Sequence, residues 1–341
     1  MKKTLLLLLL FISLTKMIKA QSLFPTTENG ITIYIDSTGA KKLITPHKRA
    51  GLFQDGMAWV IIGQKIGFMN TKGEVVITPA YEETTGFVNG FAAVLEDGAW
   101  GIINKKGEVI VEPKYFQVGD FSNGLCKFKE RDFFTSKWGF IDTTGKVVIS
   151  PQFDDVDDFH EGLAMFIYDT KAGYVDVKGK VVIQPTFQYG MLMKVDGKVV
   201  FDRGALSNGL AVVEENNKYG YIDKTGKMVI PAKYAAVESF NEGMAAVKVG
   251  EKYGFIDKAG KMAIQPIYGM GEPFSGGLAA VEVGKRFEGK WGFIDKKGKI
   301  VIPAAFYRIL IGFKNGAAQV SFDAKTWGWI DKKGKVLWKS K

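Results

Sequence analysis

The residues best suited to chemistry lie in one acidic segment near the middle of the chain. Five carboxylates and one imidazole occur close together there, namely Asp154, Asp155, Asp157, Asp158, Glu161 and His160. Such a density of oxygen ligands could hold a cation. A solvated loop between Phe153 and Gly162 also explains it, because the matching connectors elsewhere in the chain are polar. We expect the loop, and whether the cluster binds a cation stays open.

Other catalytic or metal-binding groups are scarce. The two histidines, His47 and His160, both fall in connectors, and they do not have the spacing of zinc ligands. The single cysteine, Cys126, stands where neighbouring copies of the pattern below have Ala, which favours a small buried side chain over a reactive thiol. One cysteine permits no internal disulfide. We therefore expect no enzyme, no cofactor and no metal site.

A repeat organises most of the chain. Nine glycines each close an Asp/Asn-x-x-Gly turn, at Gly39, Gly73, Gly107, Gly145, Gly179, Gly226, Gly260, Gly298 and Gly334. Their spacings are 34, 34, 38, 34, 47, 34, 38 and 36 residues. A near-constant period of this size is typical of repeat architectures. The copies start near residues 32, 66, 100, 138, 172, 219, 253, 291 and 327.

Each copy predicts at least three short strands. In the copy at 253 they are an aromatic-Gly-aromatic-Ile-Asp run, an apolar run that ends at Pro266, and a Leu-Ala-Ala-Val run that begins at Leu278. Abundant Val, Ile and Gly and an aromatic content of 13% agree with short strands joined by glycine turns. The expected fold is all-β, a series of β-meander repeats.

The recurring motif residues have structural explanations. The Asp can accept hydrogen bonds from turn amides, the turn Gly can take a positive φ, and the Gly beside the ring lets another backbone or ring approach closely. The ring itself is expected to pack between units. The motif residues are Trp100, Gly101, Trp138, Gly139, Asp142, Gly145, Tyr219, Gly220, Asp223, Tyr253, Gly254, Asp257, Trp291, Gly292, Asp295, Trp327, Gly328 and Asp331.

The run from Lys137 to Asp142, followed by Gly145, Lys146 and Pro151, resembles the WG repeat family, also called KWG repeats. The likeness extends from about Thr32 to Trp338. It implies a β-rich repeat, typical of bacterial exported and surface proteins, with an interaction role. The family supplies no catalytic residues to transfer onto this chain.

Nine such copies could form an open superhelical array or close as a β-propeller-like ring. A ring is usually closed by one terminus that supplies a strand missing from the other end. The first copy has no preceding Leu-Ala-Ala-Val run, and the chain ends after Val336-Leu337-Trp338 without supplying one. We therefore expect the open array, with the ring as the alternative. The long connector at about 188–206 is expected to contain an inserted hairpin that turns at Asp196-Gly197.

The first twenty residues are typical of a secretory signal peptide. A basic start at Lys2 and Lys3 precedes an apolar core from Leu5 to Leu14, and Ala20 is the expected cleavage site. Its removal takes away four lysines and no acid, so the formal charge falls from +10 to +6. No transmembrane segment is then expected in residues 21–341. We predict a periplasmic or extracellular protein, for which nucleic acid is a poor partner.

Lysines recur at the turns, at Lys105, Lys106, Lys296, Lys297, Lys299, Lys332, Lys333 and Lys335. Stacked repeats would align them as a basic ridge that could contact an anionic partner, although lysines also solubilise exposed turns. The expected function is a monomeric, non-enzymatic scaffold that binds a protein or peptide at the cell envelope. The alternative is binding of carbohydrate or cell-wall polymer, such as an anionic glycan, through exposed aromatics and the Lys-rich turns.

Overall fold

The computed structural model describes residues 22–131, 136–188, 194–195, 198–199 and 204–340. Every regular element in these ranges is a β-strand, and the strands are short and antiparallel. None of the described residues forms a helix with the length and hydropathy needed to cross a membrane. The expected signal peptide, residues 1–20, lies outside the described residues.

Within the described ranges we divide the strands into nine meanders, blades 1 to 9, of which blades 5 and 6 are joined in one sheet by the pairing of Gln188 with Glu214. Blade 1 comprises β1 (Phe24–Glu28), β2 (Ile31–Ile35) and β3 (Lys41–Ile44). Blade 2 comprises β4 (Met57–Ile62), β5 (Lys65–Asn70) and β6 (Val75–Tyr81). Blade 3 comprises β7 (Glu83–Val88), β8 (Phe91–Glu96), β9 (Ala99–Asn104) and β10 (Val109–Tyr115). Blade 4 comprises β11 (Gln117–Val118), β12 (Leu125–Lys129), β13 (Trp138–Asp142) and β14 (Val147–Phe153).

Blade 5 comprises β15 (Asp155–Val156), β16 (Leu163–Tyr168), β17 (Lys171–Asp176) and β18 (Val181–Gln188). Blade 6 comprises β21 (Leu210–Glu215), β22 (Lys218–Asp223) and β23 (Met228–Tyr234). Blade 7 comprises β24 (Ala236–Val237), β25 (Met244–Val249), β26 (Lys252–Asp257) and β27 (Met262–Tyr268). Blade 8 comprises β28 (Met270–Gly271), β29 (Ala279–Val283), β30 (Lys290–Ile294) and β31 (Ile300–Phe306). Blade 9 comprises β32 (Arg308–Lys314), β33 (Ala317–Ser321), β34 (Trp327–Asp331) and β35 (Val336–Lys339).

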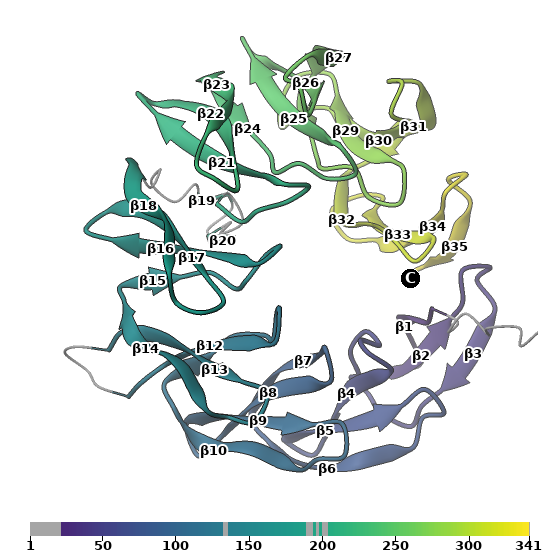
Figure 1. Cartoon of the computed structure of the whole chain (residues 1–341). Helices are drawn as coiled ribbons and strands as arrows, with labels where there is room; N and C mark the ends of the chain where they lie inside the picture. The colour runs from purple at the N-terminus through teal and green to yellow at the C-terminus, as the bar shows by residue number, and fades with distance from the viewer. Residues whose placement is uncertain (1–21, 132–135, 189–193, 196–197, 200–203, 341) are drawn as a thin grey trace, which may run out of the picture.

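The blades stand side by side in a closed ring, with β7 toward its centre and β6 and β10 at its circumference (Figure 1). The all-β repeat prediction is confirmed, and the arrangement is the β-propeller rather than the open array that we expected. The first strand of a four-stranded blade is its inner strand, and the third carries the aromatic-Gly-aromatic motif. Each sequence copy therefore supplies the last two strands of one blade and the first two of the next.

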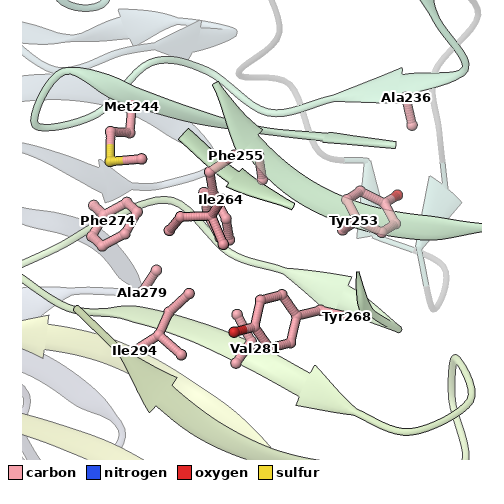
Figure 2. Packing of buried hydrophobic residues seen from close by; sticks show 11 residues of the cluster. Ala236, Met244, Tyr253, Phe255, Ile264, Tyr268, Phe274, Ala279, Val281 and Ile294 are labelled. Atoms are coloured by element: carbon pink, nitrogen blue, oxygen red, sulfur yellow. The ribbon is translucent and has the colours of Figure 1, made fainter. Parts of the chain in front are cut away.

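The core lies between blades. In the cluster between blades 7 and 8, Phe255 of β26 packs against Phe274 of the next blade, with ring centroids 5.2 Å apart (Figure 2). Tyr253 and Ile264 from one blade meet Ala279 and Val281 from the other in the same cluster. Similar clusters recur around the ring, so each blade is covered on both faces, as repeat units that cannot bury an apolar face alone must be.

The motif glycine permits a β-bulge. The Trp138 and Phe140 positions of β13 pair with Phe153 and Ile149 of β14, and the register shifts between these pairs. A Cβ added at Gly139 would lie 2.6 Å from the Ile149 carbonyl oxygen. Since a real Cβ does not approach an oxygen so closely, only Gly fits opposite the bulge.

The motif aspartate holds the turn between the third and fourth strands. Asp142 accepts hydrogen bonds at one oxygen from the Thr144 amide at 2.9 Å, the Thr144 hydroxyl at 2.6 Å and the Lys146 amide at 3.1 Å. The two amide bonds recur in all nine turns, with Asn70 and Asn104 in place of Asp in blades 2 and 3. These turns lie on one side of the ring, which we call the Asp-turn face.

One contact repeats at every blade boundary. The turn glycine of each blade lies against the outer strand of the preceding blade, as Gly260 lies against Ile230 and Gly298 against Ile264. The same contact joins the ends of the chain, because a Cβ on Gly39 would lie 2.7 Å from the Leu337 carbonyl oxygen. Blade 9 therefore meets blade 1 as any other blade meets its successor.

Candidate functional site

The acidic segment does not converge on a common point. Asp154 pairs with Lys137, Asp155 accepts a hydrogen bond from the Val156 amide at 2.9 Å, and Asp158 lies 3.7 Å from the Lys127 ammonium. Glu161 reaches toward blade 6, where its carboxylate lies 3.1 Å from Lys224. Among the described residues, no three His, Cys, Asp or Glu side chains form a group that could hold a metal ion.

The Cys126 side chain lies in the core between blades 3 and 4 with none of its surface exposed. Burial raises the pKa of the Cys126 thiol to about 12. Because a thiol is nucleophilic only as the thiolate, this environment makes Cys126 inert.

The motif rings are buried to different depths. Trp138 and Tyr253 are buried, whereas Trp100, Tyr219, Trp291 and Trp327 are half-buried. The ring two positions later lies deeper, as in Phe140 and Phe255, which have no exposed surface. The second aromatic residue of the motif, and not the first, therefore marks the centre of the interface between blades.

Polar side chains link successive blades on the Asp-turn face. The tight turn that follows each inner strand offers a carboxylate or amide oxygen to the backbone amide of the glycine in the corresponding tight turn of the next blade. Asp55 accepts from the Gly90 amide at 2.6 Å, and Glu242 accepts from the Gly277 amide at 3.1 Å. The same link joins Asn123 to Gly162, Glu161 to Gly209, and Asn208 to Gly243.

Some of the predicted basic ridge is neutralised by these links. Lys105 lies 2.7 Å from Asp55, Lys224 lies 3.1 Å from Glu161, and Lys296 lies 3.3 Å from Glu242. These lysines therefore join neighbouring blades. Exposed pairs of this kind contribute about 0–1 kcal/mol each, so they assist the packing between blades without dominating it.

Most of the exposed turn lysines lie on one half of the Asp-turn face, including the paired Lys224 and Lys296, whereas blades 2, 3 and 4 contribute Lys72, Lys106 and Lys146. In blades 5 to 9, the turns carry the exposed residues Lys178, Lys180, Lys224, Lys227, Lys258, Lys261, Lys296, Lys297, Lys299, Lys332, Lys333 and Lys335. Blades 2 and 3 instead place Glu74 and Glu108 at the position of Lys299 and Lys335. We call this set of lysines the Lys half-ring, and it gives the Asp-turn face a basic side.

The seam between blades 9 and 1 departs from the other boundaries. Blade 1 has no inner strand among the described residues, and its β1 corresponds to the second strand of a complete blade. Phe24 occupies the place of the missing inner-strand ring and packs on Trp329 with centroids 4.8 Å apart. The Trp329 indole donates a hydrogen bond to the Pro25 carbonyl at 3.1 Å.

This hydrogen bond replaces one that inner strands make elsewhere. In blade 4, the Gly119 amide donates to the carbonyl of Lys127, and in blade 8 the Glu272 amide donates to that of Ala280. Pro25 of blade 1 is equivalent to Lys127 of blade 4, because Pro25 pairs with Tyr34 as Lys127 pairs with Phe140. An indole from the last blade thus completes the backbone bonding of the first, and closure needs no shared strand. Our expectation of an open array was wrong for this reason.

A cavity remains where the inner strand of blade 1 is missing. Its volume is about 450 Å³. Its walls come from blades 9, 1 and 2, and they include the apolar side chains of Leu23, Leu52, Ile311 and Trp329 beside the polar residues Asp55, Gly56, Lys314 and Asn315. We call this space the seam cavity. It combines an apolar floor with a few polar groups, which is the usual character of a binding site.

The predicted insertion at about 188–206 lies partly outside the described residues, including its turn at Asp196-Gly197. The described parts, β19 (Lys194–Val195) and β20 (Lys198–Val199), pair antiparallel with Val195 opposite Lys198.

Comparison with known proteins agrees with this geometry. A family model described as "WG containing repeat" matches residues 66–98, 100–132, 138–169, 173–191, 219–253, 253–287 and 291–325, which together are more than half of the chain. No curated protein matches the sequence.

One solved structure with low sequence identity resembles the ring, and a second aligns with it only weakly. The crystal structure of the eukaryotic initiation factor aligns over 94% of this chain and 96% of its own, with 12% identity and a TM-score of 0.62. Saccharomyces cerevisiae Sqt1 aligns over 92% of this chain and 97% of its own, with 10% identity, and its TM-score of 0.42 adds nothing to the fold argument. At these identities the first likeness concerns the fold alone.

Proposed function

Because the chain belongs to the WG-repeat family, we propose that it is an exported, non-enzymatic scaffold that binds a protein or peptide partner at the cell envelope. The recurring Asp, Gly and aromatic residues already have structural roles in turns, bulges and blade interfaces. The observation that carries the proposal is the seam cavity, which opens an apolar surface with polar edges beside the Asp-turn face. Export rests on the sequence of residues 1–20.

Site-specific photo-crosslinking in the native cells tests this proposal. A photoreactive residue is placed at Asn315 beside the seam cavity, at Thr225 in a turn of the Lys half-ring, or at Val109 on the outer strand of blade 3. The expected result is a discrete protein adduct from at least one position on the Asp-turn face and none from Val109. Absence of a protein adduct from both Asn315 and Thr225 would overturn the scaffold proposal.

Export has its own test. N-terminal sequencing of the mature protein from the envelope or medium should begin at Gln21. A full-length chain that keeps Met1 and stays in the cytoplasm would refute it.

The Lys half-ring favours a second function, binding of an anionic envelope polymer. Acidic polysaccharide could contact many turns at once, and such contacts weaken as salt screens them. We compare retention on polygalacturonate of the wild-type protein, a variant that carries Lys297→Glu, Lys299→Glu, Lys333→Glu and Lys335→Glu, and a control with Lys72→Glu and Lys106→Glu. Loss of retention only in the first variant, and earlier elution at high salt, would support polymer binding. Equal retention of both variants would exclude the Lys half-ring as its site.

A further inference from the structure

The inner strands of other blades show what the seam cavity lacks. In blade 4, Gln117 and Val118 pair with Lys129 and Phe128 of β12, and the Phe116 amide donates to the Lys129 carbonyl at 2.9 Å. The chain then places Phe121 in the core and turns at Asn123. Blades 3, 4, 5, 7, 8 and 9 each add such a strand to the second strand of the sheet. In blade 2 a shorter segment does so, with the Gly51 amide donating to the Trp59 carbonyl at 2.9 Å. Among the described residues, blade 1 has no equivalent segment.

The matching edge of β1 is available for pairing. Glu28 and Ile31 flank the two-residue Asn29-Gly30 turn, so Glu28 bonds to β2 and the adjacent Thr27 directs its amide and carbonyl to the other edge. Thr27 is exposed and corresponds to Lys129 of blade 4. No described residue bonds to the Thr27 backbone at that edge, and exposed strand edges of this kind accept added strands.

The links between successive turns are also interrupted at the seam. Asn315 of blade 9 occupies the position from which Asn208 and Glu242 accept the amide of a glycine in the next blade. Blade 1 has no such turn in the described chain, so Asn315 has no counterpart there. In the same way, no described residue supplies the Gly56 amide of blade 2 with the acceptor that a turn of blade 1 would provide. Both residues line the seam cavity.

We propose that the seam cavity binds an extended peptide segment of a partner protein, which adds to β1 as the missing inner strand and ends in a tight turn. The peptide backbone pairs with Thr27, an apolar side chain lies among Leu23, Leu52 and Ile311, and the turn offers an acceptor to Gly56 and a donor to Asn315. This deepens the proposed scaffold function and rests on it.

The inner strands of the other blades indicate which peptide would fit the seam cavity. In other blades this place is filled by a short strand, a Phe and an Asn-Gly or Glu-Gly turn. At the seam Phe24 already fills the place of the Phe, so the occupant needs only the short strand and the turn. The segment that precedes β1, from Met17 to Ser22, contains neither an aromatic residue nor a glycine. A partner segment therefore fits the vacant strand position better than this chain's own leader.

A peptide copied from blade 4 provides the probe. A fluorescently labelled peptide with the sequence of residues 116–124 but with Ala in place of Phe121, Phe-Gln-Val-Gly-Asp-Ala-Ser-Asn-Gly, is titrated with the purified mature protein, and fluorescence anisotropy is measured. The Ala is needed because Phe24 already fills the place of that ring at the seam. A peptide of the same composition in scrambled order is the control. We expect saturable binding of the copied peptide and none of the scrambled one.

Two variants locate the binding. Thr27→Pro removes the edge amide of β1, and Leu52→Glu places a charge on the apolar wall without altering β1. Each should weaken binding by about tenfold, which corresponds to the loss of roughly one hydrogen bond or one apolar contact. Circular dichroism spectra and melting temperatures show whether both variants remain folded.

The outcomes separate this proposal from the scaffold function. No saturable binding, or equal binding by wild type and the folded Leu52→Glu variant, would overturn strand addition at the seam. If the Thr225 crosslink to a partner persists in that case, the scaffold function stands and only its location at the seam is refuted. If neither the peptide nor any crosslink is found, both proposals fail.

Discussion

The Trp329→Phe substitution tests how the ring is closed. Phe occupies the equivalent motif position in blades 2, 4, 7 and 8, so the smaller ring fits the architecture. The substitution removes the hydrogen bond from the indole to the Pro25 carbonyl and retains a ring against Phe24. An acceptor left without its partner in a buried position costs about 1–3 kcal/mol, and the part-buried Pro25 carbonyl should lie toward the lower end of that range.

The substitution should lower the free energy of local opening at the seam and leave the stability of the other blades unchanged. A local opening that becomes 1–3 kcal/mol easier is populated roughly 5- to 160-fold more often. Hydrogen exchange measured by mass spectrometry reports such openings segment by segment. We expect amide protection in β1 to fall by that factor, while protection in β17 of blade 5, on the far side of the ring (Figure 1), changes little.

Trp327→Phe is the matched control, because Trp327 lies on the same strand and packs on Trp338 at 4.8 Å without a described bond from its indole to blade 1. It should leave β1 protection close to that of the wild type. The reasoning is refuted if Trp329→Phe leaves β1 unchanged, or if protection falls equally in every blade.

Three further predictions concern the repeat. Gly254→Ala should destabilise the protein by about 3 kcal/mol or more in urea unfolding, because the new Cβ would lie 2.5 Å from the Ile264 carbonyl oxygen. Gly312→Ala is the control and should change stability by less than about 1 kcal/mol, because the atom nearest to its new Cβ would be 3.9 Å away. Cys126 should resist Ellman's reagent in the native protein and react fully in guanidinium, and rapid native labelling would contradict its burial. Hydrogen bonds from the Thr144 hydroxyl and then from its amide hold the Asp142 pKa below 3.8, so the stabilisation they give is present above that pH and is lost as pH falls through the lowered value. Thr144→Val should raise the Asp142 pKa in an NMR titration, and an unchanged titration would show that the hydroxyl bond is unimportant.

Local chemistry made much of the fold predictable from the sequence. The spacing of Asp142 and Gly145 identifies a turn because a carboxylate and a positive φ are both required within four residues. Gly139 could likewise be assigned to a close approach, because no other residue leaves room for a carbonyl opposite the strand. These features depend on neighbours along the chain or on the adjacent strand.

Closure could not be predicted in that way. It depends on an indole and a carbonyl 304 residues apart in sequence. The indole stands where the other blades have Phe, Tyr or, in blade 3, Ile102, and it makes a bond that a backbone amide makes elsewhere. The roles of Glu161 and Lys224 were missed for a similar reason, since each residue bonds to the neighbouring blade. The one available signal was the Trp at 329, where every other copy has a smaller residue.

The way this ring closes also bears on how its size could change. In ring proteins closed by a shared strand, one blade is divided between the two ends of the chain, so a gained or lost repeat must preserve that division. Here every blade is contiguous in sequence, and the two ends meet through side chains and a turn. Duplication or deletion of a whole repeat between blades 2 and 9 would therefore keep every residue that makes the closing contacts, and a change in ring size would need adjustment only of the angle between blades.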